Sequence, residues 1–298
     1  MKLEAVNIVK HFSKKKILHE VTFEVNSSRI MGFLGRNGAG KTTTIRCLVD
    51  VFKQDSGSFV LDGKVFNPNH YKIGYLPEER GMYQKATLLD QLVYFARLRG
   101  ATRQEALKSA KYWINRFDLS DFEKKSLEVL SKGNQQKIQI AQAFLNDPDI
   151  IILDEPFSGL DPVNAQMFKD IIVEYAKEDK LIIFSSHQMS YVEELCDDVT
   201  LINEGRILVN GDLNTLKRQL GKNKALVKAD NLSNELLAQT LSEFNPEVSN
   251  KGVIVTSDLE HQELLNLILS KEIEIAQFGY YEPSLQDIFV RLVSEHHA

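Results

Sequence analysis

The chain has 298 residues, 43% of them hydrophobic, which is enough for one large domain or two ordinary ones with a substantial core. Its 36 Lys and Arg against 41 Asp and Glu give a formal net charge of −5. That balance, without a basic block, disfavours sequence-independent binding to nucleic acid. Cys47 and Cys196 fit neither a zinc nor a CxxC spacing, and no apolar run reaches the roughly 18 residues that span a bilayer. The N-terminus also lacks the apolar core of a signal peptide, so we expect a cytosolic chain.

The first two thirds of the chain alternate predicted strands and helices. Strand-like segments occupy residues 3–9, 21–25, 30–34 and 56–63, and helical spacing runs through residues 88–117 with a break at Thr102. The continuous apolar runs 150–153 and 181–184 are typical of parallel strands that are buried on both faces, and a helical segment lies between them. This alternation predicts an α/β domain with a mainly parallel sheet.

The pattern changes after about residue 215. A predicted strand at 224–229 is followed by a helix, a hairpin, a second helix, a strand at 272–281 and a closing helix. That order is close to a split βαβ, ferredoxin-like unit. We place the domain boundary between residues 216 and 217, where only residues 221–224 resemble a linker.

The stretch GRNGAGKT fits the phosphate-loop pattern G-x-x-x-x-G-K-[ST]. It follows the predicted strand Ile30–Leu34 and precedes a helical pattern, which is the context that such a match requires. Its glycines allow a tight turn whose N–H groups point inward, and Lys41 is placed to reach the β- and γ-phosphates. The alternative is a glycine-rich turn that matches by chance. The predicted nucleotide-binding residues are Gly35, Arg36, Asn37, Gly38, Ala39, Gly40, Lys41, Thr42 and Thr43.

Three further side chains follow the ends of the two buried strands. Asp154 and Glu155 end the run IIILDE, and His187 follows LIIFSS. Ligands of open α/β sheets bind at the carboxyl ends of the strands. We therefore expect Thr42 and Asp154 to hold Mg²⁺, Glu155 to polarise a water molecule and His187 to contact phosphate. The alternatives are a surface acid for Glu155 and a structural hydrogen-bond donor for His187.

The polar stretch LSKGNQQK, residues 130–137, lies before the helical run KIQIAQAFL. Ser131 and the backbone of Gly133 could donate to phosphate at a helix N-terminus. One nucleotide cannot easily use two such loops. We therefore expect the second loop to serve the nucleotide of another copy of the chain.

In this order, the motifs resemble those of the ATP-binding subunits of ABC transporters, over about residues 3–215. GRNGAGKT resembles the Walker A loop, IIILDE the Walker B strand, and His187 the switch histidine. Residues 158–161 resemble the D-loop, which implies that Asp161 takes part in the site. LSKGNQQK resembles the signature LSGGQ, with Lys132 in place of a glycine and Asn134 in place of a glutamine.

Two more positions follow from the resemblance. Phe12 matches the aromatic residue that stacks on adenine, although a packed core phenylalanine is the alternative. Glu78 stands where the family commonly has the Q-loop glutamine, so it could reach Mg²⁺ or the attacking water. Residues 80–145 match the helical subdomain, which in this family contacts the membrane subunit.

Together these features predict a P-loop NTPase of the ABC type, residues 1–216, followed by an accessory α+β domain, residues 217–298. The resemblance implies an ATP- and Mg²⁺-dependent ATPase that pairs with a second copy or a paralogue. It would power an integral-membrane permease at the cytoplasmic face of the membrane, as exporter ATPases with a similar ending (YYEPSLQDIFVRLV) do. The alternatives are a soluble ABC ATPase that acts on ribosomes or nucleic acid, and a module that binds ATP without hydrolysing it.

Overall fold

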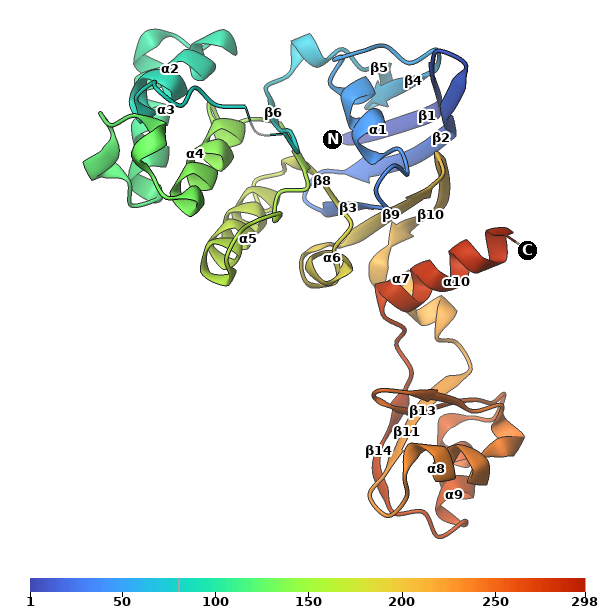
Figure 1. The fold of residues 1–298 in the computed structure, drawn as a ribbon. Helices are drawn as coiled ribbons and strands as arrows, with labels where there is room; N and C mark the ends of the chain where they lie inside the picture. The colour runs from blue at the N-terminus through green and yellow to red at the C-terminus, as the bar shows by residue number, and fades with distance from the viewer. Residues whose placement is uncertain (80, 298) are drawn as a thin grey trace. The chain divides into compact units, whose positions relative to one another are not determined.

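The computed structural model describes residues 1–79 and 81–297 and divides the chain into two compact units, Met1–Asp212 and Leu213–Ala298 (Figure 1). The boundary expected between residues 216 and 217 falls inside helix α7 (Leu213–Leu220). Residue 80, at the expected start of the helical subdomain, and residue 298 lie outside the described part of the chain.

A six-stranded sheet forms the centre of the first unit. Its strand order is β10-β9-β3-β8-β7-β6, and every pairing is parallel except that of β10 with β9. β7 and β8 are buried along their whole length, as their continuous apolar runs predicted. The strands are β3 (Ile30–Leu34), β6 (Ile73–Leu76), β7 (Ile150–Asp154), β8 (Leu181–Ser186), β9 (Asp198–Asn203) and β10 (Arg206–Asp212).

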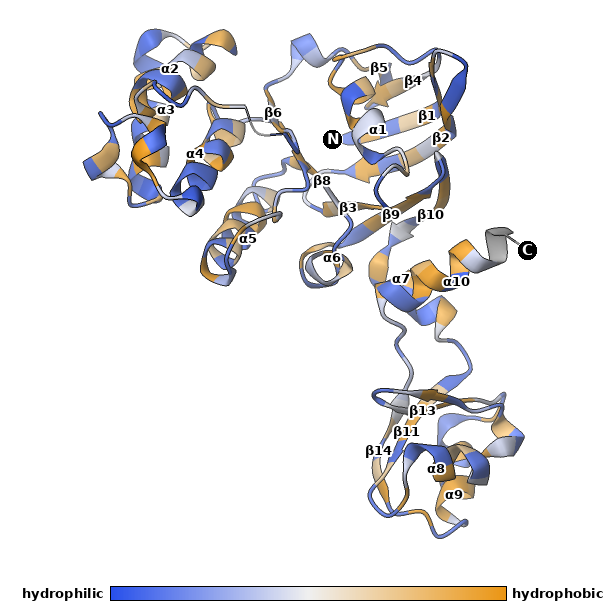
Figure 2. Ribbon diagram, viewed as in Figure 1, coloured by the Kyte–Doolittle hydropathy of each residue, from blue (hydrophilic) through white to orange (hydrophobic). Residues whose placement is uncertain are grey.

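A second, antiparallel sheet in the same unit has the order β2-β1-β4-β5. Hydrophobic and hydrophilic residues alternate along β2, which is typical of a strand with one buried face (Figure 2). One buried cluster joins this sheet, helix α1 and the central sheet through side chains such as Leu3, Ile45 and Ile152. The elements are β1 (Lys2–Phe12), β2 (Lys15–Asn26), α1 (Lys41–Leu48), β4 (Ser56–Leu61) and β5 (Lys64–Val65).

In the described part of the chain between β6 and β7, three α-helices are joined by loops and short 3-10 turns: α2 (Leu88–Leu98), α3 (Arg103–Arg116) and α4 (Lys132–Phe144). The break predicted at Thr102 is confirmed, because its hydroxyl caps α3 and Glu105 completes a capping box. Trp113 is buried and donates from Nε1 to the carbonyl of Phe144 at 3.2 Å. Its ring also stacks on Tyr175, so α3 and α4 pack against α5 (Pro162–Ala176). The short helix α6 (Met189–Leu195) follows β8.

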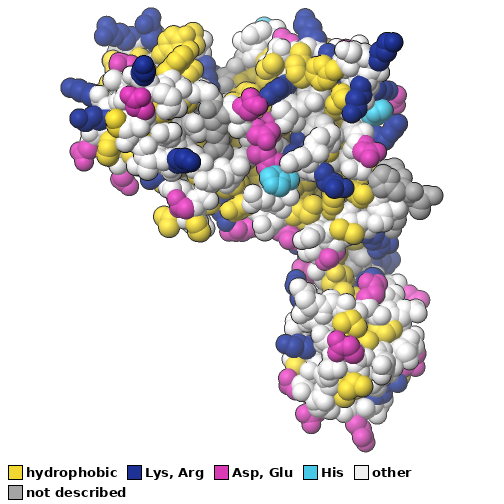
Figure 3. Space-filling view, viewed as in Figure 1, with side chains coloured by type: hydrophobic (Ala, Val, Ile, Leu, Met, Phe, Trp, Pro, Cys, Tyr) yellow, Lys and Arg dark blue, Asp and Glu magenta, His cyan; other side chains and the backbone are white. Residues whose placement is uncertain are grey.

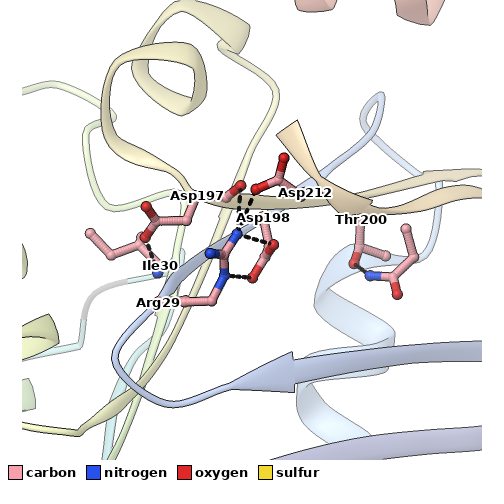
Figure 4. A network of polar contacts seen from close by, with 7 residues as sticks. Arg29, Ile30, Asp197, Asp198, Thr200 and Asp212 are labelled. Atoms are coloured by element: carbon pink, nitrogen blue, oxygen red, sulfur yellow. Dashed lines mark hydrogen bonds and ion pairs between the residues drawn. The ribbon is translucent and has the colours of Figure 1, made fainter. Parts of the chain in front are cut away.

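Strands β9 and β10, which the sequence analysis did not predict, are tied to the start of β3 by Arg29 (Figure 4). Its guanidinium donates twice to Asp198 at 2.6 Å and once to Asp212 at 2.8 Å. Asp197 accepts from the backbone N–H of Ile30 at 2.9 Å. These contacts join β9 and β10 to the start of β3, at the end of the strand opposite the phosphate loop.

The second unit contains an antiparallel sheet of order β12-β13-β11-β14. Two helices connect its strands in the sequence β-α-β-β-α-β, which is the ferredoxin-like arrangement that the sequence pattern predicted. The elements after α7 are β11 (Lys224–Ala229), α8 (Asn234–Thr240), β12 (Glu247–Ser249), β13 (Gly252–Thr256), α9 (His261–Leu269), β14 (Ile275–Tyr280) and α10 (Leu285–His297). Within residues 1–79 and 81–297, no helix combines the length and the apolar character needed to cross a membrane.

Candidate functional site

The phosphate loop joins the end of β3 to the start of α1, as predicted. Gly40 occupies the cap position of α1 with φ 113°, a left-handed conformation that favours glycine. A Cβ atom on Gly35 would lie 2.4 Å from the carbonyl oxygen of Ile202, so the loop can pass β9 only with glycine at this position. The loop therefore presents the N-terminus of α1 at the edge of the sheet, where phosphate groups bind well.

Lys41 is buried at the base of this loop. Its Nζ donates to the carbonyl of Gly35 at 2.7 Å and lies 3.4 Å from Glu155 Oε1. The carbonyl contact holds the loop closed around the ammonium group. The ammonium also offsets the charge of Glu155, which is only 6% exposed.

The two acids at the end of β7 have different surroundings. Asp154 is fully buried and accepts a short hydrogen bond from the hydroxyl of Ser185 on β8. Burial raises the pKa of the Asp154 carboxyl, and hydrogen bonds from the hydroxyls of Ser185 and Thr42 oppose that rise. Glu155 has a left-handed backbone with φ 50°, and its N–H donates to the Ser185 hydroxyl at 3.2 Å.

His187 follows β8, and its Nδ1 lies 2.9 Å from Glu155 Oε2. Its side chain is 44% exposed, so the imidazole remains accessible from solvent. The structure thus brings Lys41, Glu155 and His187, predicted from three separate motifs, into one chain of contacts.

A pocket of about 240 Å³ lies over the phosphate loop. Glu78 and Glu155 line it together with residues of the loop. Acidic and basic side chains are mixed over the surface drawn in Figure 3. Among the predicted residues near the loop, Gly35, Ala39, Phe12, Asp154 and His187 do not line this pocket; Asp154 and His187 adjoin it through Ser185 and Glu155. Its lining residues are Arg36, Asn37, Gly38, Gly40, Lys41, Thr42, Thr43, Glu78 and Glu155.

The signature-like stretch was expected to be a loop before a helix, but α4 already begins at Lys132. Ser131 is its cap and accepts from the N–H of Asn134 at 3.4 Å, which explains why the helix starts there. Gly133 packs against the start of α5, since a Cβ atom on it would lie 3.2 Å from Asn164 Nδ2. None of residues 130–137 is among the lining residues of the phosphate-loop pocket.

Asp161 caps α5 by accepting from the N–H of Asn164 at 2.9 Å. The same Asp161 carboxylate accepts from Asn164 Nδ2 at 2.5 Å. The predicted D-loop residue therefore lies next to the start of α4, in the same surface region as Gly133.

Phe12 is 46% exposed, so the packed-core alternative does not describe it. Its ring stands edge-on to Phe52, with 5.2 Å between the centroids. Asp55 accepts from the backbone N–H of His11 at 2.6 Å and lies 3.2 Å from Lys10 Nζ, so it holds the end of β1. Phe52 and Asp55 could not be predicted from the sequence, because nothing in the local pattern connects them with Phe12, which lies 40 and 43 positions away.

The donor atoms around the loop fit a hard cation in part. Thr42 supplies a hydroxyl and Asp154 a carboxylate oxygen, and Mg²⁺ is usually held by one or two such groups together with substrate phosphates and water. Among the described residues, no group of three or more His, Cys, Asp or Glu side chains could hold a metal ion without a nucleotide.

Comparison with known proteins places this site in a family. The family model described as ABC transporter matches residues 18–158. Over 289 residues, the chain is 38% identical to the uncharacterised ABC transporter ATP-binding protein YhaQ of Bacillus subtilis (strain 168). That alignment covers 96% of this chain and 97% of that protein. The chain belongs to the ATP-binding proteins of ABC transporters.

Further similarities of this ABC ATPase include the second unit. A model described as the C-terminal domain of DrrA1-3-like ATP-binding proteins matches residues 211–293. The bacitracin transport ATP-binding protein BcrA of Bacillus licheniformis is 33% identical over 299 residues, covering 98% of this chain and 97% of that protein. A solved structure of an ATP-binding subunit of an ABC transporter matches with a TM-score of 0.68 and 29% identity, over 74% of this chain and 94% of that one.

Proposed function

We propose that this ABC ATPase hydrolyses ATP–Mg²⁺ at sites shared between two chains and thereby drives export through a separate integral-membrane permease. The main support for this proposal is that the predicted motifs lie in two separate regions of the first unit. Lys41, Glu155 and His187 are linked at the phosphate loop, whereas Ser131 and Gly133 lie outside that pocket, against the start of α5.

Each group at the pocket has a separate role. Lys41 neutralises the β- and γ-phosphates, and Thr42 and Asp154 hold Mg²⁺, which offsets phosphate charge when it is bound. Glu155 accepts the proton of the attacking water. His187 orients Glu155 through their 2.9 Å contact, and its exposed imidazole would contact the γ-phosphate of a bound nucleotide. Glu78 lines the same pocket as Glu155 and would contact Mg²⁺ or the attacking water.

The signature region acts on the nucleotide of a second chain, either a copy or a paralogue. Ser131 and Asn134 stand at the N-terminus of α4, which favours an anion. Gly133 brings the backbone of that helix turn close to Asp161, so the two segments form one surface. A nucleotide bound to the mate would complete the contacts that this surface leaves open.

The permease contact belongs to the helical subdomain. Tyr83, Tyr94 and Phe95 form an aromatic cluster in which Tyr83 is 56% and Tyr94 48% exposed. Exposed aromatic clusters are typical of protein interfaces.

The proposed direction of transport rests on the likeness to the bacitracin transport protein over both units and on the DrrA-like C-terminal match. The chain would then work at the cytoplasmic face of the membrane.

Mixing two inactive variants tests the shared site. Ser131→Arg places a bulky cation where a hydroxyl should approach phosphate, so it should bind ATP but hydrolyse it poorly. Lys41→Ala should lose ATP binding. A mixed dimer has one site with both defects and one with neither, so the mixture should regain part of the parent activity. If Ser131→Arg abolishes ATP binding to isolated chains, the signature region serves its own nucleotide and the proposal is wrong.

The proposed contact with a permease needs a separate measurement. Tagged protein purified from gently solubilised membranes should bring down an integral-membrane chain. Replacing Tyr83 and Tyr94 by serine should weaken that recovery without changing ATPase activity of the purified chain. Unchanged recovery would move the permease contact elsewhere on the molecule.

A further inference from the structure

The second unit contains a cavity of about 580 Å³, and none of its lining residues is among the predicted ATP-site residues. It lies where the connection from α7 to β11 passes the connection from β14 to α10, and the start of α9 closes one side. Its lining residues are Arg218, Gly221, Lys222, Asn223, Lys224, Ala225, Ser257, Asp258, Leu259, Glu260, His261, Leu264, Tyr280, Tyr281 and Glu282.

The walls of the cavity are tied together by backbone contacts. The N–H of Tyr281 donates to the carbonyl of Lys224 at 3.0 Å, and the N–H of Ser257 donates to the carbonyl of Asn223 at 2.9 Å. A Cβ atom on Gly221 would lie 2.2 Å from the carbonyl oxygen of Tyr281, so the two connections approach as closely as backbone allows. Because these groups satisfy one another, the cavity has a defined shape.

One part of the cavity is apolar and aromatic. Leu264 and Ala225 are buried beneath it, at 2% and 1% exposure. The rings of His261 and Tyr280 lie 3.6 Å apart, and Tyr280 is 75% exposed. An exposed ring that is already supported on one side can stack a further planar group at little conformational cost.

The rim carries charges of both signs. Lys224 is paired with Glu247 at 2.8 Å, and Asp258 accepts from Asn223 at 2.7 Å. The remaining rim charges are two cations and two anions that have no ion-pair partner within residues 1–79 and 81–297. They are Arg218, Lys222, Glu260 and Glu282.

We propose that this cavity binds a small zwitterion with a planar apolar group, the chemistry of a free aromatic amino acid. The carboxylate pairs with Arg218 or Lys222, the ammonium pairs with Glu260 or Glu282, and the ring lies on Tyr280 above Leu264. A ligand with one charge leaves either the cations or the anions unpaired. A bound zwitterion touches both connections and stiffens them.

Calorimetric titration of the full chain with L-phenylalanine tests the site. We expect saturable binding with a dissociation constant below about 1 mM. The single-charge analogues 3-phenylpropanoate and 2-phenylethylamine should each bind at least about tenfold more weakly, because each loses one ion pair. No saturation with L-phenylalanine, or equal affinity for either analogue, would overturn the proposal.

Matched variants locate the binding. Arg218→Gln and Glu282→Gln should each weaken L-phenylalanine binding at least about fivefold. Lys228→Gln and Glu235→Gln remove the same charges from exposed positions that do not line the cavity, and they should bind as the parent does. Equal losses in the control pair would place the binding elsewhere. The readout is ligand binding, so failure here would leave the ATPase proposal untouched.

Discussion

The carboxylate of Glu155 contacts both Lys41 and His187, so a substitution of Glu155 should affect ATP hydrolysis directly. Glu155→Gln keeps the shape of the side chain but removes a proton acceptor. Hydrolysis should fall by about 10²–10⁴-fold, as is usual for loss of a general base, while ATP binding persists. Single-turnover hydrolysis and equilibrium ATP binding measure the two effects. Turnover within a few-fold of the parent would mean that another group is the base.

Asp55 is a second residue with a specific consequence. Hydrogen bonds from His11 and the ion pair with Lys10 lower the pKa of Asp55 to about 2, so it is ionised at neutral pH. Asp55→Ala should release the end of β1 and misplace Phe12. The expected result is a KM for ATP raised about three- to tenfold with an unchanged kcat.

Asp62→Ala is the control for Asp55. Asp62 also accepts a backbone N–H, from Lys2 at 2.7 Å, in the same antiparallel sheet but away from Phe12. Its KM for ATP should match that of the parent. Equal effects of the two substitutions would show a general loss of sheet stability rather than a role in positioning Phe12.

At the scale of elements, the contact of Arg29 with β9 and β10 should matter for stability. Arg29→Ala leaves Asp198, whose side chain is 13% exposed, without its bidentate partner. We expect the free energy of unfolding to fall by about 1–3 kcal/mol. Denaturant titration measures it. Lys2→Ala removes exposed ion pairs with Glu4 and Glu24 that water and salt screen, so it should lower the free energy of unfolding less than Arg29→Ala does. A similar loss in both variants would argue against a special role for Arg29.

The sequence predicted those elements whose signal is local. β7 and β8 are continuous apolar runs, and Thr102 with Glu105 forms a recognisable cap. β9 and β10 were missed although they form a local hairpin, in which Asn203 and Arg206 pair across the two-residue turn Glu204-Gly205. Only their contact with Arg29, which lies 169 positions from Asp198, has no local signal. The start of α4 was placed too late, because the polar residues 132–137 hide a helix that Ser131 caps.

The candidate site also contains some residues that a local sequence pattern predicts and others that it does not. The phosphate loop carries its own pattern, so Lys41 and Thr42 could be found from spacing alone. The support of Phe12 by Phe52 and Asp55 has no such pattern, because a turn after α1 meets the end of β1 only in the folded chain. Which chain supplies the second half of the site depends on association, and it stays a prediction.

At the scale of the whole molecule, the two units have separate buried clusters. A chain that ends at Asp212 keeps both sheets of the first unit and all the side chains at the phosphate loop. It should unfold cooperatively and bind ATP within about threefold of the full chain. Thermal denaturation and ATP titration of the shortened chain check this. A shortened chain that fails to fold would mean that the second unit supports the first.

The left-handed backbone of Glu155 has an evolutionary consequence. For a residue with a Cβ atom, φ 50° costs about 1–2 kcal/mol relative to glycine, and asparagine tolerates it better than glutamate does. Selection for stability alone would therefore favour the replacement of glutamate at this position. A lineage that no longer needed hydrolysis would be expected to lose Glu155 early and to gain thermal stability by doing so.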